Sequence, residues 1–288
     1  MRILVTNDDG IDSEGLHVLA RAMGVHGEVT IVAPDDEYSG ASAALGAIHR
    51  IQPEVHRAQV TGVEVAWAVS GPPALCVMFA RLGAFGPPFD LVVSGINPGV
   101  NVGRSVYHSG TVGAALTARA GGISGVAVSQ AVEGFGVEGQ CWDEMLRGQL
   151  WQDAAEVASV VVGGLLAGSP RAPVVVNVNV PNLAVKDMAG WQRTAIGRIP
   201  PRVISEAGLE PKLGHPGTFR VAMKWGDAVS LPEGTDGGAI ERDLVSVTLL
   251  GALTDVDASL DVSAEEAVRP TIGAALDGLF ASSGSTGR

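Results

Sequence analysis

The fold is decided by the stretch RILVTNDDGIDSEGLHVLARAMGVHGEVTIVAP, which spans residues 2–34. Residues 2–6 are rich in Ile, Leu and Val and end in a polar turn, as expected of a buried strand. From Leu16 to Met23 the apolar residues recur at i, i+3, i+4 and i+7, which predicts a helix. A second β-branched run at residues 28–33 predicts another strand. This order predicts a right-handed βαβ unit with parallel strands.

The same alternation continues along the chain. Further strand patterns occupy residues 90–94, 125–129, 174–180 and 244–250, and helical patterns occupy residues 75–82, 112–116 and 157–164. We therefore predict an α/β fold in which helices cover both faces of an open parallel sheet. Ligands of such sheets bind at the carboxyl ends of the strands, so we expect the chemistry to follow Thr6, Ala33 and Ser94.

The pattern changes after about Pro181. Between residues 191 and 238 the helical period is lost, and Pro, Gly and charged residues accumulate, which predicts hairpins and loops that protrude from the core. We predict an α/β core over residues 1–185. Residues 186–288 are predicted to form an arm, a returning strand and a terminal helix, and the Ser- and Gly-rich tail at 282–288 is predicted to be disordered.

The composition excludes several classes of protein. The chain has 288 residues and a formal charge of −12, which argues against a protein that binds DNA or RNA through clustered Lys and Arg. An apolar content of 46% is too high for a disordered chain. No apolar run approaches the roughly 18 residues of a membrane helix, and we recognise no targeting segment. The two cysteines, Cys76 and Cys141, favour a reduced, cytoplasmic compartment.

Carboxylates follow the first predicted strand, in the sequence Asn7-Asp8-Asp9-Gly10. Adjacent like charges are costly to desolvate, so a bound cation would explain them. Carboxylates with other oxygen ligands suit Mg²⁺ or Mn²⁺. Taken alone, the motif also fits a solvated turn.

Small and polar residues follow the second and third predicted strands. After the second strand, Ser39 and Gly40 allow the backbone to approach an anion or a metal closely. After the third, the loop SGINPGVNVG at residues 94–103 supplies the neutral oxygens of Asn97 and Asn101.

The third predicted helix is preceded by Ser109, Gly110 and Thr111. Free N–H groups and hydroxyls at a helix start form a site for phosphate, although a simple helix cap has the same residues. The four loops together indicate metal-assisted phosphate chemistry. The chain has no P-loop, no GxSxG elbow, no HExxH motif and no cysteine-rich zinc site, which removes the rival chemistries.

These motifs resemble those of the SurE family, the survival-protein 5′-nucleotidases. The resemblance runs from residue 1 to about residue 181 and returns near residues 232–236 and 245–248. It implies a Rossmann-like, three-layer core, hydrolysis of nucleoside monophosphates, and a C-terminal part that makes dimer or tetramer contacts. It further implies one divalent cation, Mg²⁺ or Mn²⁺, in each subunit.

The resemblance also assigns roles to single residues. The implied metal ligands are Asp8, Asp9, Ser39 and Asn97, and the implied phosphate or substrate ligands are Asn7, Gly40, Asn101, Ser109, Gly110 and Thr111. Asp8 and Asp9 are also the candidate catalytic groups, because one of them could serve as general base. His108 could protonate the leaving oxygen, but an isolated histidine is more often structural or exposed to solvent.

Three positions depart from the family pattern. Pro72 and Leu75 stand where the family usually has a threonine and an acid, and Thr117 stands where it usually has a glutamate. A phosphatase for another small ester and a non-catalytic nucleotide-binding or assembly protein therefore remain as alternatives. The partner we expect in each case is a small phosphate compound, with no membrane and no nucleic-acid polymer.

Overall fold

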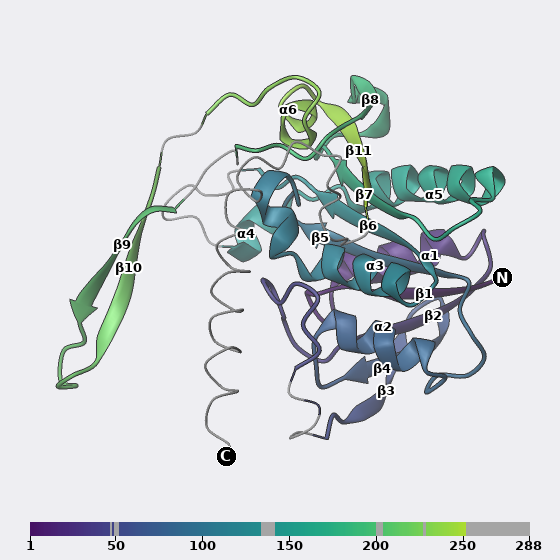
Figure 1. The fold of residues 1–288 in the computed structure, drawn as a ribbon, viewed down its shortest axis with the longest axis horizontal. Helices are drawn as coiled ribbons and strands as arrows, with labels where there is room; N and C mark the ends of the chain where they lie inside the picture. The colour runs from purple at the N-terminus through teal and green to yellow at the C-terminus, as the bar shows by residue number, and fades with distance from the viewer. Residues whose placement is uncertain (47, 49–51, 134–141, 200–203, 227–228, 252–288) are drawn as a thin grey trace, which may run out of the picture. The chain divides into compact units, whose positions relative to one another are not determined.

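The computed structural model describes residues 1–251 apart from 47, 49–51, 134–141, 200–203 and 227–228 (Figure 1). The described residues form one compact unit. The terminal helix and the tail predicted beyond residue 251 lie outside the described residues, and the predicted boundary after residue 185 stays a prediction.

A nine-stranded sheet forms the centre of the described unit, in the order β3-β4-β2-β1-β5-β6-β7-β11-β8. Its strands are β1 (Arg2–Thr6), β2 (Glu28–Pro34), β3 (Val55–Val60), β4 (Val63–Val69), β5 (Leu91–Pro98), β6 (Ser124–Gln130), β7 (Val175–Val180), β8 (Gly190–Arg193) and β11 (Leu244–Leu250). From β4 to β7 every neighbouring pair is parallel, which confirms the predicted parallel sheet.

Among the strands toward the two sides of the sheet, β11 was predicted, at residues 244–250, whereas β3, β4 and β8 were not. β3 pairs with β4, and β11 with β7, in antiparallel fashion. Most of the β3 side chains are exposed, so the strand lacks the apolar pattern that marks the central strands. The antiparallel outer pairs are thus an addition to the predicted sheet.

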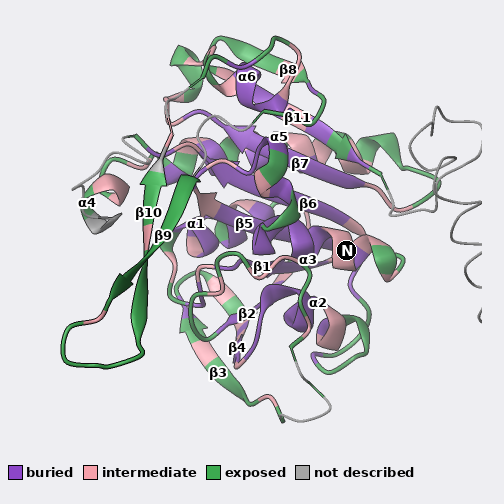
Figure 2. Ribbon diagram, turned by 60° about the vertical axis from the view of Figure 1, so that its left-hand side comes forward, coloured by how far each residue is buried: buried purple, intermediate pink, exposed green. Residues whose placement is uncertain are grey.

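Helices cover both faces of the sheet, as predicted. They are α1 (Glu14–Met23), α2 (Pro73–Arg81), α3 (Gly110–Ala120), α4 (Trp142–Leu146), α5 (Trp151–Gly168) and α6 (Asp236–Ile240), with 3₁₀ turns η1 (Gly103–Tyr107) and η2 (Val185–Asp187). Successive side chains of a strand point to opposite faces. In β1, Ile3 and Val5 therefore pack with α1 and α5, while Leu4 packs with α2 and α3. Figure 2 shows the resulting buried layer along the strands.

A second, two-stranded antiparallel sheet lies within the predicted arm. It consists of β9 (Ile204–Pro211) and β10 (Phe219–Trp225), which pair with each other and with no described strand of the larger sheet. Several of its apolar side chains are exposed, including those of Leu209, Phe219 and Val221. Over the described ranges, no helix combines the length and apolar character needed to cross a lipid bilayer.

The strand order places the predicted site loops together. From β1 the chain moves outward to β2 and β4, and it then returns to the other side of β1 as β5. In parallel sheets this point of reversal is where ligands bind, beyond the carboxyl ends of the strands. The segments that follow β1 and β2 and the end of β5 meet at this point.

Candidate functional site

Asp8 lies beyond the end of β1 and is almost fully buried, at 2% exposure. Its Oδ1 accepts a hydrogen bond of 2.5 Å from the hydroxyl of Thr111, at the start of α3. Burial raises the pKa of the Asp8 carboxyl, while hydrogen bonds from the Thr111 side chain and from the N–H groups of Thr111 and Gly110 oppose the rise. The start of α3 therefore favours the ionised form of a buried carboxylate.

Gly110 makes this close approach possible. A Cβ atom at that position would lie 2.8 Å from both Cβ and Oδ2 of Asp8, which is closer than real side chains approach. The N-terminus of α3 can reach the carboxylate only because residue 110 has no side chain.

Asp9 provides the second carboxylate. Burial raises the pKa of Asp9 well above its usual value, and the charges of Asp8 and Glu37 raise it further. Its Oδ2 is buried and has no hydrogen-bond partner among the described residues. A buried oxygen left unsatisfied is costly, so a ligand is expected to contact it.

Backbone hydrogen bonds hold the segment after β2 next to Asp8 and to the start of α3. The N–H of Tyr38 donates to the carbonyl of Asp8 at 2.7 Å, and the N–H of Ser42 donates to the carbonyl of His108 at 3.0 Å. Ser39 is exposed, and its hydroxyl donates to Glu37 at 2.8 Å, which leaves the oxygen lone pairs of Ser39 free to bind a cation.

Glycine is required at one position in the segment after β2 and at one position in α3. Gly40 has a φ of +81°, a backbone conformation that L side chains rarely adopt. A Cβ at Gly113 would lie 2.2 Å from the carbonyl oxygen of Ser42, so α3 packs directly on the segment that carries Ser39.

Asn97 belongs to β5 rather than to the loop predicted after Ser94. The strand continues because pairing with β6 resumes at Asn97 after a register shift. The side-chain nitrogen of Asn97 donates to the carbonyls of Gly99, at 2.6 Å, and Pro98, at 3.3 Å. This orientation leaves Oδ1 as the acceptor, which is the atom that binds a cation.

The donors present fit a hard divalent cation. They comprise two carboxylates, a hydroxyl and an amide oxygen, the ligand types that Mg²⁺ and Mn²⁺ prefer. The unsatisfied Oδ2 of Asp9 supports the fit. Within the described part of the chain, no three His, Cys, Asp or Glu side chains form a metal-binding group. That finding agrees with a ligand set in which only two members are of these types.

The residues predicted to bind phosphate or substrate fall into two groups. Ser109, Gly110 and Thr111 start α3, where Ser109 Oγ accepts a hydrogen bond from the N–H of Val112 at 3.1 Å and so caps the helix. Asn101 instead lies among buried polar groups: its Nδ2 donates to Ser129 Oγ at 2.8 Å.

Asn7 supports the turn that carries the carboxylates. Its Nδ2 donates to the carbonyl of Gly10 at 3.0 Å, and its buried Oδ1 has no partner among the residues described.

His108, the candidate proton donor, is exposed to solvent. The departures from the family pattern are held within the fold, since Pro72 and Leu75 are buried and the Thr117 hydroxyl donates to the carbonyl of Gly113 at 2.7 Å.

Sequence analysis gave no role to Asp236, which the structure shows to be fully buried. Its carboxylate accepts hydrogen bonds from the N–H groups of Gly103, Gly197 and Gly237 at 2.8–2.9 Å. It therefore fixes the segment after β5 to the C-terminal part of the chain. Its position directly before Gly237 and Gly238 was the one feature of the sequence that could have pointed to this role.

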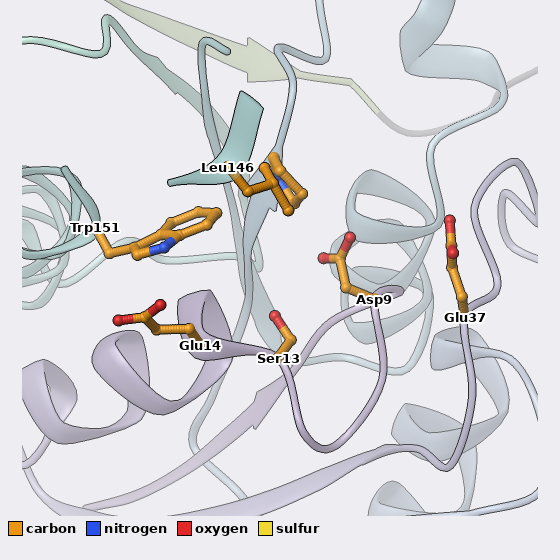
Figure 3. Close-up of a pocket in the computed structure, with 7 residues that line it drawn as sticks. Asp9, Ser13, Glu14, Glu37, Leu146 and Trp151 are labelled. Carbon is orange, nitrogen blue, oxygen red and sulfur yellow. The ribbon is translucent and has the colours of Figure 1, made fainter. Parts of the chain in front are cut away.

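A cavity of about 240 Å³ adjoins Asp9. Figure 3 shows Asp9 and Glu37 on one side of it, Trp151 and Glu14 on the other, and Ser13 between them. Sequence analysis did not single out Trp151 or Glu14, because each lies at a helix start, before the predicted helical pattern, and belongs to no motif. The cavity places an aromatic surface close to the candidate metal ligands.

Comparisons with known proteins agree with this geometry. The family model described as "Survival protein SurE" matches residues 3–201. A solved structure, the SurE protein from Aquifex aeolicus, is similar with a TM-score of 0.71 and 28% sequence identity. The match covers 92% of this chain and 100% of that chain.

Proposed function

This chain belongs to the SurE family, a family of metal-dependent phosphatases, and on that premise we propose that it hydrolyses nucleoside 5′-monophosphates to nucleoside and phosphate. The observation that carries the proposal is the contact between Asp8 and the start of α3. It opposes the rise in pKa that burial causes and so favours the ionised form of Asp8, the form that a metal ligand needs, at a helix end that attracts anions.

In this proposal Asp8, Asp9, Ser39 and Asn97 hold one divalent cation, Mg²⁺ or Mn²⁺. When bound, such an ion lowers the pKa of a neighbouring water and neutralises charge on the phosphate. The remaining groups orient the ester: Ser109, Gly110 and Thr111 lie where α3 begins, and Asn7, Gly40 and Asn101 belong to the surrounding segments. This division of roles is supported by the positions of these residues at one edge of the sheet.

Either Asp8 or Asp9 accepts the proton of the attacking water in this proposal. Without a cation, burial and the charges of Asp8 and Glu37 raise the pKa of Asp9 well above its usual value. A bound cation opposes this rise, because a nearby positive charge favours the ionised carboxyl. Attack on phosphorus opposite the ester oxygen then breaks the P–O bond and releases the nucleoside.

The test is release of free phosphate from a panel of nucleoside monophosphates, with Mg²⁺ or Mn²⁺ and with a chelator. We expect release only with metal, and a loss of at least about 100-fold in the Asp8→Asn variant. Asp12→Asn is the matched control, because Asp12 is an exposed acid of the same loop. Near-normal, metal-dependent release by Asp8→Asn would contradict the ligand assignment.

The same panel separates the alternatives. Faster hydrolysis of sugar phosphates or other small esters than of any nucleotide would identify a phosphatase of different specificity. Release from no ester at all would favour a non-catalytic nucleotide-binding protein.

We also propose that the protein is a cytoplasmic homodimer or homotetramer. The β9–β10 hairpin supports the association, because it exposes 69% of Leu209, 53% of Phe219 and 59% of Val221. Clustered exposed apolar residues are typical of a contact surface. The buried, free thiol of Cys76 suits a reducing compartment.

A further inference from the structure

Two buried asparagines interrupt the apolar run of β7. The strand reads VVNVNV, and Asn177 and Asn179 are both fully buried, although buried parallel strands are usually continuous runs of Val, Ile and Leu. The two residues are two positions apart, so their side chains lie on the same face of the sheet. Burying an amide costs free energy unless it is hydrogen-bonded, so the partners of these side chains indicate what they do.

Both asparagines bind the backbone of Asn101, in the loop after β5. The N–H of Asn101 donates to Oδ1 of Asn179 at 2.7 Å, and Nδ2 of Asn179 donates to the carbonyl of Asn101 at 3.2 Å. Nδ2 of Asn177 donates to the same carbonyl at 2.9 Å. One buried side chain thus pairs with both backbone groups of Asn101, and a second reinforces it.

The side chain of Asn101 is held as well. Its Nδ2 donates to Oγ of Ser129, in β6, at 2.8 Å. Ser129 is in register with Asn179 in β7 and with Asn97 in β5, so a row of polar residues crosses three strands and ends at a candidate metal ligand. The sheet therefore fixes Asn101, a candidate phosphate ligand, relative to Asn97.

The stability of β7 does not explain these asparagines. Oδ1 of Asn177 is buried and has no partner among the described residues, and an unpaired buried acceptor destabilises the folded state. Valine at this position would fit the strand without leaving a polar atom unpaired. The placement of Asn101 accounts for both asparagines better than the packing of the sheet does.

Asp236 holds the other end of the same loop. Its buried carboxylate accepts a hydrogen bond from the N–H of Gly103 at 2.8 Å. The chain then continues through η1 to Ser109, which caps α3. Residues 101–103 are thus fixed at both ends by buried side chains, directly before the segment that starts α3.

We propose that Asn179 is a positioning residue, assisted by Asn177 and Ser129. It holds the side chain of Asn101 at the place where that side chain meets the phosphate group of the substrate. Asn179 is fully buried, so it acts on the ester only through Asn101. The inference rests on the proposed phosphatase function and adds to it a buried support that the reaction needs.

A double-mutant cycle tests the proposal. Wild type, Asn179→Ala, Asn101→Ala and the double variant are compared by kcat/KM for a nucleoside 5′-monophosphate. Misplacing a substrate ligand by about 1 Å can cost about 100-fold, so we expect Asn179→Ala to lower kcat/KM by about tenfold or more. In the Asn101→Ala background it should lower kcat/KM by less than about twofold, because the residue through which it acts is already missing. Losses that multiply in the double variant would overturn the proposal.

Ser129→Ala repeats the test with a smaller change. It removes only the hydroxyl that accepts the hydrogen bond from Asn101, so it serves even if Asn179→Ala fails to fold. We expect a loss of about threefold or more in kcat/KM that disappears in the Asn101→Ala background. The same loss in both backgrounds would show that Ser129 does not act through Asn101.

Thr194→Val is the matched control for stability. The buried hydroxyl of Thr194 shares hydrogen bonds with Ser246 at 2.8 Å and with Thr248 at 2.7 Å, and none with Asn101 in the described part of the chain. Thr194→Val should lower the unfolding temperature and leave kcat/KM within about twofold of wild type. If Thr194→Val lowered kcat/KM as much as Asn179→Ala, the effect of Asn179 would be one of stability alone.

Binding of inorganic phosphate separates this inference from the proposed function. Phosphate is titrated by calorimetry into the four proteins of the cycle in the presence of Mg²⁺, and we expect Asn179→Ala to weaken its affinity only where Asn101 is present. If no ester is hydrolysed but phosphate binds in this pattern, the phosphatase proposal is wrong and the positioning role holds. If esters are hydrolysed but Asn179→Ala acts equally with and without Asn101, the positioning role is wrong. It is also wrong if the wild-type protein binds no phosphate.

Discussion

The hydroxyl of Thr111 donates a hydrogen bond of 2.5 Å to the carboxylate of Asp8, although 103 residues separate the two in the chain. Both residues are buried. The bond joins the first strand to the third helix at the candidate metal site, and it orients a carboxylate that the site needs in its ionised form.

Replacing this donor tests its role. Thr111→Val keeps the shape of the side chain but removes the hydroxyl, so it should weaken metal affinity by about 10–100-fold, the usual effect of losing a partner of a metal ligand. Titration calorimetry with Mg²⁺ or Mn²⁺ measures the change. Thr111→Ser keeps the hydroxyl and should recover most of the affinity. Equal affinities for Val and Ser would show that the hydrogen bond does not orient Asp8.

The raised pKa of Asp9 predicts a pH-dependent stability of the metal-free protein. Because the pKa is higher in the folded state than the value of about 3.9 in an unfolded chain, the folded protein binds more protons between the two values. The free energy of unfolding should therefore fall as pH rises through this interval, and Asp9→Asn should abolish that contribution.

Thermal unfolding in a chelator measures this effect. Asp9→Asn should unfold a few degrees above the wild-type protein at pH 8, and the difference should shrink toward pH 4. Glu64→Gln, which replaces an exposed acid of β4, is the control. If the unfolding temperatures of Asp9→Asn and wild type differ by the same amount at both pH values, burial does not raise the pKa of the Asp9 carboxyl.

The sequence predicted the centre of the fold better than its periphery. Buried parallel strands are continuous apolar runs, so β1, β2, β5, β6 and β7 could all be recognised. β3 and β4 were not recognised, because exposed or polar side chains interrupt the apolar run in both strands. The hairpin of β9 and β10 lies in the region predicted to form hairpins and loops, but its two strands were not located within that region, since its apolar residues are exposed and alternate weakly.

The candidate site shows the same division. Asp8, Asp9 and the start of α3 could be predicted because chemistry in parallel sheets follows the strand ends. Trp151 could not, because an aromatic residue at a helix start is explained equally well by packing. Asn97 was expected in a loop but lies in β5. The strand pairs with β6 again at Asn97 after a register shift, and no residue pattern in the sequence predicts such a shift.

The exposed hairpin predicts the oligomeric state. If β9 and β10 form a contact between subunits, Val221→Glu should place a charge in that contact and shift the protein toward the monomer. Light scattering after gel filtration measures the mass. Glu206→Gln, an exposed position of β9 that removes a charge, should not change it. An unchanged mass for Val221→Glu would assign the association to another surface.

Two glycines in helices provide the last prediction. Gly113 in α3 and Gly164 in α5 are both helical, but a Cβ at Gly113 would lie 2.2 Å from the carbonyl oxygen of Ser42, while a Cβ at Gly164 meets nothing within 4 Å. Gly164→Ala should therefore stabilise the protein by about 0.5–1 kcal/mol, since alanine reduces the entropy of the unfolded chain.

Gly113→Ala should do the opposite, because the backbone at Ser42 must move to accept the methyl group. The displaced segment carries Ser39 and Gly40, so phosphate release should also fall by about tenfold or more. Thermal unfolding and phosphate release of the two variants, measured together, distinguish the cases. If Gly113→Ala lowered stability without affecting phosphate release, the segment after β2 would pack on α3 without taking part in the site.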